Sequence, residues 1–580
     1  MKKIIFIMAF CLLGVPLMTQ TIQENPIISY AAKVTRENLT FMEYEDEVVV
    51  TDCEFLAEGE IVIPSEVNGK PVTSINSSTF QSCYKITSVI IPDTVTSIGW
   101  WAFKGCKSLE IISIPETITY IGRDAFSNSL WLENQKQENP LVIVDNILVD
   151  GTACEGEVII PEGVHTINTH AFYQNETITS VVIPDTVTSI EDCVFQGCIN
   201  LENIPIPDTV VSIDNQAFSD TLWLENQQTE NPLVIINGIL IDGTACEGEV
   251  IIPETVHTIG EFAFYTSQTI TSAVIPNTVT SIGKTAFYHC TNLESIILPE
   301  GLDNIPPSMF VNCRSLKSIR IPETVTSIGS SAFSGCDSLT EIIIPDSVTE
   351  IKGDAFRGCT SLTEIIIPDS VIKIEDGAFR ECTQLTSVHL GTGLTSIAGE
   401  IFSRCTSLAE INIPENVKSI GYEAFSGCAS LTSIVIPANV NGIGGWAFFH
   451  CENLQSVTIE NADCKLSDGY TFFSGGNPED GDDAYSGIIY GYPNSTAQTY
   501  AELHGYHFEP ITQATELKGD VNADGVFDVL DVVLLQKWLL SVPDTHLTNW
   551  KAGDFTQDGM LNVFDLILMK HELLYQSTEI

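Results

Sequence analysis

Phenylalanine recurs at every twenty-third position along most of this chain, and this period limits the possible folds more strongly than any other feature of the sequence. The interval doubles at two places, after Phe126 and after Phe218. The residues in register are Phe80, Phe103, Phe126, Phe172, Phe195, Phe218, Phe264, Phe287, Phe310, Phe333, Phe356, Phe379, Phe402, Phe425 and Phe448. Because one such unit is too short to bury its own apolar side chains, successive units must stack and share a core. The period therefore predicts an elongated solenoid.

The segment PETVTSIGSSAFSGCDSLTEIIIP, from Pro322 to Pro345, contains one complete unit. Its LTEIII portion can direct Leu339, Ile342 and Ile344 towards a core, since side chains alternate between the two faces of a strand. Proline ends this strand, and a second extended piece follows. The Ala-Phe pair and the cysteine three positions later predict a tight turn that packs under the next rung. We therefore expect a mainly β fold.

This pattern resembles the BspA-like family of leucine-rich repeats, found mainly in bacterial surface and secreted proteins. The resemblance covers residues 61–460 and implies a curved solenoid with a strand ladder on one face. An open solenoid end invites aggregation, so both ends should be capped. We expect an N-terminal cap over residues 33–60, with a hairpin at Leu39–Glu54. We also expect a C-terminal cap over residues 461–510, with a short helix after Ser495.

Seventeen cysteines in an exported protein would ordinarily indicate disulfides, but their spacing here argues otherwise. Eleven of them stand three positions after a repeat phenylalanine: Cys83, Cys106, Cys198, Cys290, Cys313, Cys336, Cys359, Cys382, Cys405, Cys428 and Cys451. This column predicts buried free thiols that pack as small apolar side chains. The alternative is a metal site, which would need convergent ligands. Ser129, Asn175, Thr221 and Ser267 take the cysteine position in other rungs, and such tolerance favours packing.

Two near-identical segments, four repeat lengths apart, interrupt the period with LWLENQKQENPLVIVDNILVD and LWLENQQTENPLVIINGILID. Each contains an apolar run on both sides of a turn, at Asp145–Asn146 and at Asn237–Gly238, and so predicts a hairpin in place of a normal rung. Trp131 and Trp223 have two interpretations. They form a paired ligand-binding projection, or they are core residues of a variant rung.

Two columns of side chains should point outward from the strands, eight and ten positions after each phenylalanine. The first column is mostly Ser and Glu, whereas the second is rich in β-branched residues such as Ile297 and Ile343. An apolar stripe beside a polar one suits a protein ligand. The alternative is that β-branched residues simply favour strands. Neither column contains an aromatic residue, so stacking of sugar rings is poorly supported there.

The chain carries 76 acidic and 25 basic residues, and its net charge of -51 would repel nucleic acid and anionic lipid. The ten histidines are scattered, and the chain has no GxSxG, HExxH or GxxxxGK[ST] motif. With so many acids, a catalytic carboxylate pair cannot be argued from sequence. We therefore expect a non-catalytic protein.

The first residues have the composition of a secretory signal peptide, which we place at residues 1–32. Lys2 and Lys3 precede an apolar run that is too short for a confident membrane span, and cleavage is expected near Ala31 or Ala32. No later apolar segment approaches ~18 residues, so we expect no membrane insertion.

Two acidic loops follow a linker that we place at residues 511–517. GDVNADGVFDVLD begins at Gly519, and GDFTQDGMLNVFD begins at Gly553. Both match a calcium-loop template, with oxygen ligands at positions 1, 3, 5, 7, 9 and 12 and glycine at position 6. The first loop offers Asp520, Asn522, Asp524, the carbonyl of Val526, Asp528 and Asp531. The second offers Asp554, Thr556, Asp558, the carbonyl of Met560, Asn562 and Asp565. A helix-like apolar run follows each loop.

Asp at position 12 and the loop-helix order resemble a type I dockerin, over residues 518–580. The resemblance implies a small α-helical module that binds two Ca²⁺ ions and docks onto a cohesin of a scaffoldin. It also implies that cohesin is contacted by equivalent residues of both halves: Val529, Leu530, Gln536, Lys537, Val563, Phe564, Lys570 and His571. The second loop has fewer carboxylates, so we expect it to bind calcium more weakly.

These features predict a secreted or cell-surface protein of a cellulosome-type, polysaccharide-degrading assembly. Its dockerin would bind cohesin, and its rod would recognise a protein, a glycan or a cell surface, as in adhesion. The alternative is a polysaccharide-degrading enzyme or an enzyme inhibitor, because dockerins most often accompany catalytic modules.

Overall fold

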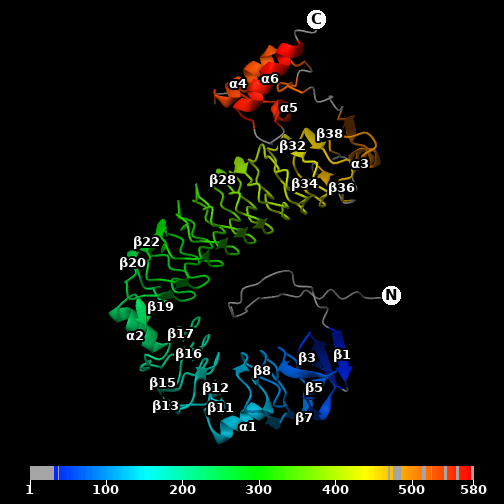
Figure 1. Cartoon of the computed structure of the whole chain (residues 1–580). Helices are drawn as coiled ribbons and strands as arrows, with labels where there is room; N and C mark the ends of the chain where they lie inside the picture. The colour runs from blue at the N-terminus through cyan, green and yellow to red at the C-terminus, as the bar shows by residue number, and fades with distance from the viewer. Residues whose placement is uncertain are drawn as a thin grey trace. The chain divides into compact units, whose positions relative to one another are not determined.

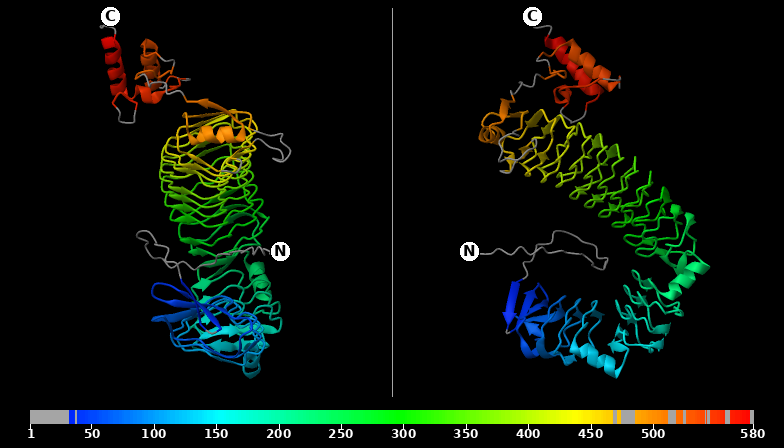
Figure 2. Two further views of the ribbon diagram at one scale, coloured as in Figure 1. Left: turned by 90° about the vertical axis from the view of Figure 1, so that its right-hand side faces the viewer. Right: turned by 180° about the vertical axis from the view of Figure 1, so that it is seen from behind.

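The computed structural model describes residues 32–36, 38–467, 471–473, 485–511, 518–523, 526–540, 542, 545–556 and 561–576. These residues belong to two compact units, Met1–Gly243 and Thr244–Ile580. In each unit, short strands recur from rung to rung, and successive rungs lie side by side (Figure 1 and Figure 2). The predicted mainly β solenoid is confirmed.

The strands of the first unit lie in two parallel ladders, and each ladder is interrupted at the inserted segment at residues 130–150. The first ladder contains β4 (Glu58–Val62), β7 (Lys85–Ile90), β9 (Ile111–Ser113), β13 (Gly156–Ile159) and β15 (Ile178–Val182). The second contains β6 (Lys70–Ile75), β8 (Ser97–Ile98), β10 (Tyr120–Ile121), β14 (Thr166–Ile167), β16 (Ser189–Ile190) and β17 (Ser212–Ile213). Ser97 pairs with Ser74, and Tyr120 pairs with Ser97. Paired residues are therefore one repeat apart.

The second unit repeats this arrangement, and each of its two ladders consists of three successive hydrogen-bonded sheets. Its first ladder contains β20 (Gly248–Ile251), β22 (Ile270–Val274), β24 (Ser295–Ile297), β28 (Glu364–Ile366), β30 (Ser387–His389), β32 (Ser433–Ile436), β35 (Ser456–Ile459), β38 (Ile488–Gly491) and β39 (His507–Pro510). Its second contains β21 (Thr258–Ile259), β23 (Ser281–Ile282), β25 (Asn304–Ile305), β26 (Ser327–Ile328), β27 (Glu350–Ile351), β29 (Lys373–Ile374), β31 (Ser419–Ile420), β33 (Gly442–Ile443) and β36 (Lys465–Leu466). The short strands β34 (Phe448–Phe449) and β37 (Phe472–Phe473) pair separately.

The turn around each phenylalanine has a backbone conformation that the sequence does not predict. In the rung of Phe333, the flanking residues Ser331 and Gly335 both have positive φ, at 56° and 71°. This alternation points backbone N–H groups towards the next rung. Ser331 donates to the carbonyl of Gly353 at 2.9 Å, and Phe333 donates to that of Ala355 at 2.8 Å. The turns are thus hydrogen-bonded between rungs as the strands are.

The phenylalanines form stacks inside the rungs, each of which ends at an inserted segment, and the longest runs from Phe264 to Phe448. The rings of Phe333, Phe356 and Phe379 are fully buried and nearly parallel, with centroids 5.3 and 5.2 Å apart. Strands in a ladder are ~4.8 Å apart. The rings therefore stack at close to the spacing of the strands.

The predicted column of buried free thiols is confirmed, since every described cysteine is free and all eleven members of the column are buried. From Cys106 onward, each thiol of the column donates to the carbonyl of the repeat phenylalanine one rung before; Cys359, for example, donates to Phe333 at 3.2 Å. Burial raises the pKa of the Cys382 thiol to about 12. These cysteines therefore pack as small buried side chains.

The two inserted segments contain the predicted hairpins and, in addition, a helix that was not predicted. The helices are α1 (Leu130–Glu138) and α2 (Leu222–Glu230), and the hairpins pair β11 (Val142–Val144) with β12 (Ile147–Asp150) and β18 (Val234–Ile236) with β19 (Ile239–Asp242). Trp131 and Trp223 are buried, with their rings 4.6 and 4.7 Å from those of Phe126 and Phe218. The core interpretation is confirmed, and that of a projecting ligand site is wrong.

Ser129 and Thr221 explain how these helices begin. Both occupy the cysteine position of a rung, and both are N-caps: Ser129 Oγ accepts from Leu132 N–H at 3.2 Å, and Thr221 Oγ1 accepts from Leu224 N–H at 3.1 Å. A buried hydroxyl satisfies a helix N–H, which a thiol does poorly. These hydroxyls therefore stabilise the start of the two helices, although the replacement alone is not sufficient, since no helix follows Ser267.

The structure contains the elements expected near both ends of the array. In the first unit, β2 (Leu39–Glu43) and β3 (Val48–Cys53) form an antiparallel hairpin, to which β1 (Ala32–Arg36) adds, while β5 (Glu66–Val67) pairs with β6. In the second unit, α3 (Thr496–His504) begins after Ser495, whose hydroxyl caps it. Both local predictions are confirmed.

Candidate functional site

The residues after 517 form a small helical module with its own core. It contains α4 (Val529–Leu539), α5 (Trp550–Gly553) and α6 (Val563–Gln576). The core consists of Val521, Phe527, Val532, Leu535, Leu566 and Met569. The first acidic loop leads into α4, and the second leads from α5 into α6. Gly519 has φ +101°, and a Cβ there would collide with the ring of Phe527, so glycine is required at the loop entrance.

Asp531, the last ligand position of the first loop, closes that loop with both carboxylate oxygens. Its Oδ1 accepts from Asn522 N–H at 3.1 Å, and its Oδ2 accepts from Asp528 N–H at 2.9 Å. Asp528 in turn caps α4, with Leu530 N–H donating to its Oδ1 at 2.6 Å. The first turn of α4 thus fixes the position of the Asp531 carboxylate, and this carboxylate fixes the conformation of the first loop.

Asp565 closes the second loop with the same pattern, at the equivalent position of the second half. Its Oδ1 accepts from Thr556 N–H at 2.9 Å, and its Oδ2 accepts from Asn562 N–H at 2.9 Å. Phe564 N–H donates to Asn562 Oδ1 at 2.8 Å, as Leu530 does to Asp528. Burial alone would raise the pKa of the Asp565 carboxyl, but the hydrogen bonds from Thr556 and Asn562 outweigh it and hold the pKa below the ordinary value.

The loop residues fit a bound calcium ion. Asp531 and Asp565 have no exposed surface, and Asp520 is 6% exposed. Buried carboxylates need a compensating positive charge. Among the described residues, no lysine or arginine forms an ion pair with Asp531 or Asp565. Calcium prefers a set of carboxylate, amide and carbonyl oxygens such as these loops supply.

The remaining predicted ligands lie around these closures. Asn522, Asp528, Asp554 and Asn562 are half-buried, whereas Val526 and Thr556 are exposed. Three predicted ligands, Asp524, Asp558 and Met560, lie outside the described residues.

The eight predicted cohesin-binding residues all lie on the surface of α4 and α6. Val529 and Leu530 are 62% and 61% exposed, and their equivalents Val563 and Phe564 are 56% and 66% exposed. Gln536, Lys537, Lys570 and His571 are exposed one to two turns further along the two helices. Lys570 Nζ donates to Gln536 Oε1 at 3.2 Å, so these equivalent positions meet where the helices pack together.

Sequence reasoning missed further exposed apolar residues on the same helices. Val533 and Ile567 are equivalent positions, as are Leu540 and Leu574, and all four are exposed. The available signal was their recurrence at the same places in both halves of the module. Two matching apolar surfaces therefore lie next to the two loops.

On the rungs, both predicted outward columns do point outward. In the second unit, Ile297 and Ile343 of the β-branched column are exposed, as is Glu341 of the polar column, whereas Ile342 between them is buried. Nothing in this alternation identifies a ligand.

The stacked rungs define a leucine-rich-repeat solenoid, and the paired loops with their helices define a duplicated calcium-loop module. The family model described as "BspA type Leucine rich repeat region" matches six copies, in residues 73–174, 151–247, 242–363 and 349–475. The chain belongs to this BspA type leucine-rich repeat family. The "Dockerin type I domain" model matches residues 518–574.

Two solved structures of bacterial leucine-rich repeat proteins are similar to this chain. A leucine rich cell surface protein from Faecalibacterium prausnitzii is 30% identical, with 62% of this chain and 94% of that chain covered and a TM-score of 0.29. A leucine-rich repeat protein from Bacteroides ovatus is 28% identical, with 70% and 95% covered and a TM-score of 0.28. No curated protein matches the chain.

The matched families carry some functional information by themselves. Type I dockerins are calcium-binding modules that dock onto cohesins in cellulosome-type assemblies, and both families are typical of extracellular or cell-surface proteins. Both are non-catalytic kinds of domain. Across the described residues, none of the helices combines the length and apolarity needed to span a bilayer.

Proposed function

We propose that this chain is a secreted, non-catalytic interaction protein of a polysaccharide-degrading assembly. Its dockerin attaches it to a cohesin of a scaffoldin, and its rod of repeats recognises a further partner, as an adhesion module does. The observation that carries this proposal is the identical closure of the two loops by Asp531 and Asp565. Residues 1–32 act as the signal peptide.

Each loop binds one Ca²⁺ ion through the ligands predicted from the sequence, and the ions hold the module folded. The buried carboxylates support this assignment, because without a cation two charges would be buried with only neutral partners. Calcium binding is therefore coupled to presentation of the exposed residues on α4 and α6.

Cohesin binds to one of two equivalent surfaces. One is centred on Val529 and Leu530, and the other on Val563 and Phe564. The similar exposure of these pairs supports binding in either of two orientations, in which one half of the module makes the main contacts each time.

The test is capture of the full chain by immobilised type I cohesin modules. Capture should be lost with a chelator and in the double variant Asp520→Ala/Asp554→Ala, and kept in Asp346→Ala, which removes an exposed aspartate of a rung. Leu530→Asp alone should leave capture largely intact, whereas Leu530→Asp with Phe564→Asp should abolish it. Leu503→Asp changes an exposed leucine outside the dockerin and serves as the control.

Capture that persists in both the chelator and the double aspartate variant would refute the dockerin assignment. Hydrolysis of plant polysaccharides by the purified chain would refute the non-catalytic part of the proposal and favour an enzyme.

A further inference from the structure

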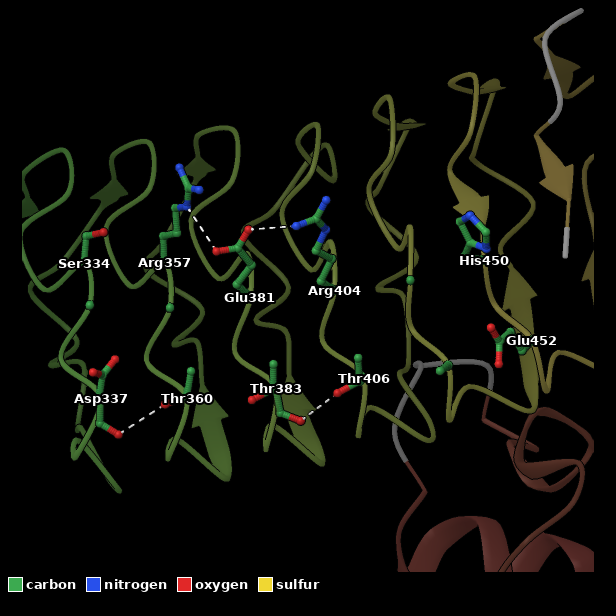
Figure 3. Close-up of a pocket in the computed structure, with 14 residues that line it drawn as sticks. Ser334, Asp337, Arg357, Thr360, Glu381, Thr383, Arg404, Thr406, His450 and Glu452 are labelled. Carbon is green, nitrogen blue, oxygen red and sulfur yellow. Dashed lines mark hydrogen bonds and ion pairs between the residues drawn. The ribbon is translucent and has the colours of Figure 1, made fainter. Parts of the chain in front are cut away.

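A groove crosses six rungs of the second unit, on the side where the phenylalanine turns lie. It has a volume of about 670 Å³ and extends from the rung of Phe333 to that of Phe448. Its lining comes from the residues one, two and four positions after each phenylalanine, as Figure 3 shows. It is therefore separate from the strand-face columns and lies along the direction in which the rungs stack.

One row of side chains in this groove presents hydrogen-bond donors. Glu381 lies between Arg357 and Arg404 of the neighbouring rungs, with its Oε2 3.6 Å from Arg357 Nε and its Oε1 3.3 Å from Arg404 Nη1 (Figure 3). A guanidinium carries five N–H donors, and the carboxylate engages only part of them. The Glu381 carboxylate thus orients the guanidinium groups of Arg357 and Arg404. Each guanidinium keeps N–H donors that a ligand can use.

A second row, parallel to the first, presents acceptors. Thr360, Thr383 and Thr406 occupy the same position in successive rungs (Figure 3). Thr406 Oγ1 donates to the carbonyl of Thr383 at 3.2 Å, and Thr360 Oγ1 donates to that of Asp337 at 3.5 Å. A hydroxyl whose proton is engaged in this way offers its lone pairs to a ligand.

An aromatic platform adjoins one end of the groove. His450, which lines the groove, contacts the ring of Phe449 at 4.0 Å between centroids. Trp446 lies 5.4 Å from Phe449 and 5.9 Å from Tyr422. Trp446 and Tyr422 are 38% and 49% exposed. The two outward columns of the strand face contain no aromatic residue, whereas here an aromatic cluster continues from His450 beyond the residues that line the groove.

This combination of features selects one chemical class of ligand. Hydroxyl groups both donate and accept, so they can satisfy the arginine and threonine rows together, and the apolar face of a sugar ring stacks on an aromatic side chain. A polyanion would meet Asp337, Glu381 and Glu452 in a chain of net charge -51.

We propose that this groove binds a neutral, linear polysaccharide chain that runs across the rungs, with a sugar ring stacked on Trp446 and hydroxyl groups bonded to Arg357, Arg404 and the threonine row. This proposal rests on the proposed function and extends it, because it names the class of ligand that the repeats bind. The binding itself is independent of cohesin.

The experiment measures binding of the full chain, by calorimetry and tryptophan fluorescence, to cellohexaose, xylohexaose and oligogalacturonate, with an extended peptide mixture as a further arm. One of the neutral oligosaccharides should bind. Trp446→Ala should weaken that binding about tenfold, the effect expected from one lost stacking contact with its hydrogen-bonded neighbours. Arg404→Ala should weaken it too, whereas Tyr84→Ala, which removes an exposed aromatic residue of the first unit, should not.

Cohesin capture of every variant, measured in parallel, checks that the chain is folded and separates the two proposals. No binding of either neutral oligosaccharide, with cohesin capture intact, would overturn the groove assignment and leave the dockerin assignment standing. Binding unaffected by Trp446→Ala and Arg404→Ala, or binding confined to oligogalacturonate or to peptide, would also overturn it.

Discussion

Glu191 is a carboxylate in an unfavourable place, and its removal should stabilise the protein in a pH-dependent way. It follows β16 in the first unit and is half-buried. Burial, followed by repulsion from Asp214 of the next rung and from its neighbour Asp192, raises its pKa to about 7, although Ser189 Oγ donates to it at 3.3 Å. Tyr120 is a further titratable group close to it. The folded state therefore favours the protonated acid.

The sign and size of the effect follow from this shift. Between pH 4.5 and about 7 the folded state binds a proton that the unfolded state releases, so stability falls as pH rises through this window and stays lower above it. A pKa of about 7 in place of 4.5 corresponds to about 3 kcal/mol. Because Glu191 keeps partial access to water, we expect about 1–2 kcal/mol in practice. Glu191→Gln should recover this amount at pH 8 and almost none at pH 5.

Amide hydrogen exchange of peptides that span β16 and β17, compared between variant and wild type at each pH, measures this local stability. Glu375→Gln is the matched control, because Glu375 also lies four positions before its repeat phenylalanine. Burial would raise the pKa of Glu375, but hydrogen bonds from Lys373 and Gly353 N–H outweigh it and lower the pKa. This control should lose protection at pH 8. Equal gains for Glu191→Gln at pH 5 and pH 8 would refute the reasoning.

Two further predictions concern the core and the loops. Phe356→Ala should cost about 3–5 kcal/mol in urea unfolding, because the ring is fully buried between two others in the stack; a cost below ~1 kcal/mol would contradict the shared core. In calcium titrations, Asp520→Ala should remove the tighter of two sites and Asp554→Ala the weaker, since the first loop carries more carboxylates; the reverse order would contradict the ranking by ligand charge.

The sequence predicted the stacked rungs because a unit this short has no other way to bury its phenylalanine. It did not predict the positive φ values beside that residue, since side chains such as Ser331 and Glu400 have no strong preference for this conformation. Hydrogen bonds between rungs impose it, and these appear only once the rungs are stacked. The helices α1 and α2 were missed for a similar reason. Each is too short to show a clear helical periodicity, and the hydroxyl in place of a cysteine is not specific, since Ser267 has one and no helix follows it.

The two candidate sites also differ in how far the sequence predicts them. The calcium loops were predictable residue by residue, because a metal imposes its ligand spacing on a local stretch of chain. The groove was not, although its threonines recur at the same position of successive rungs. Arg357 stands one position after its phenylalanine, and Glu381 and Arg404 stand two after theirs, so only the fold of the turn brings them into one row.

The register of one repeat between paired strands also determines how this protein can evolve. Since Ser97 pairs with Ser74 and Tyr120 with Ser97, the gain or loss of whole repeats restores the same partners at every new junction. The near-identical segments that begin at Leu130 and Leu222 lie four repeats apart, as in-frame recombination between repeats would leave them. The number of repeats is thus a heritable variable that selection can adjust in steps of one rung, because each added rung folds in the same way as the last.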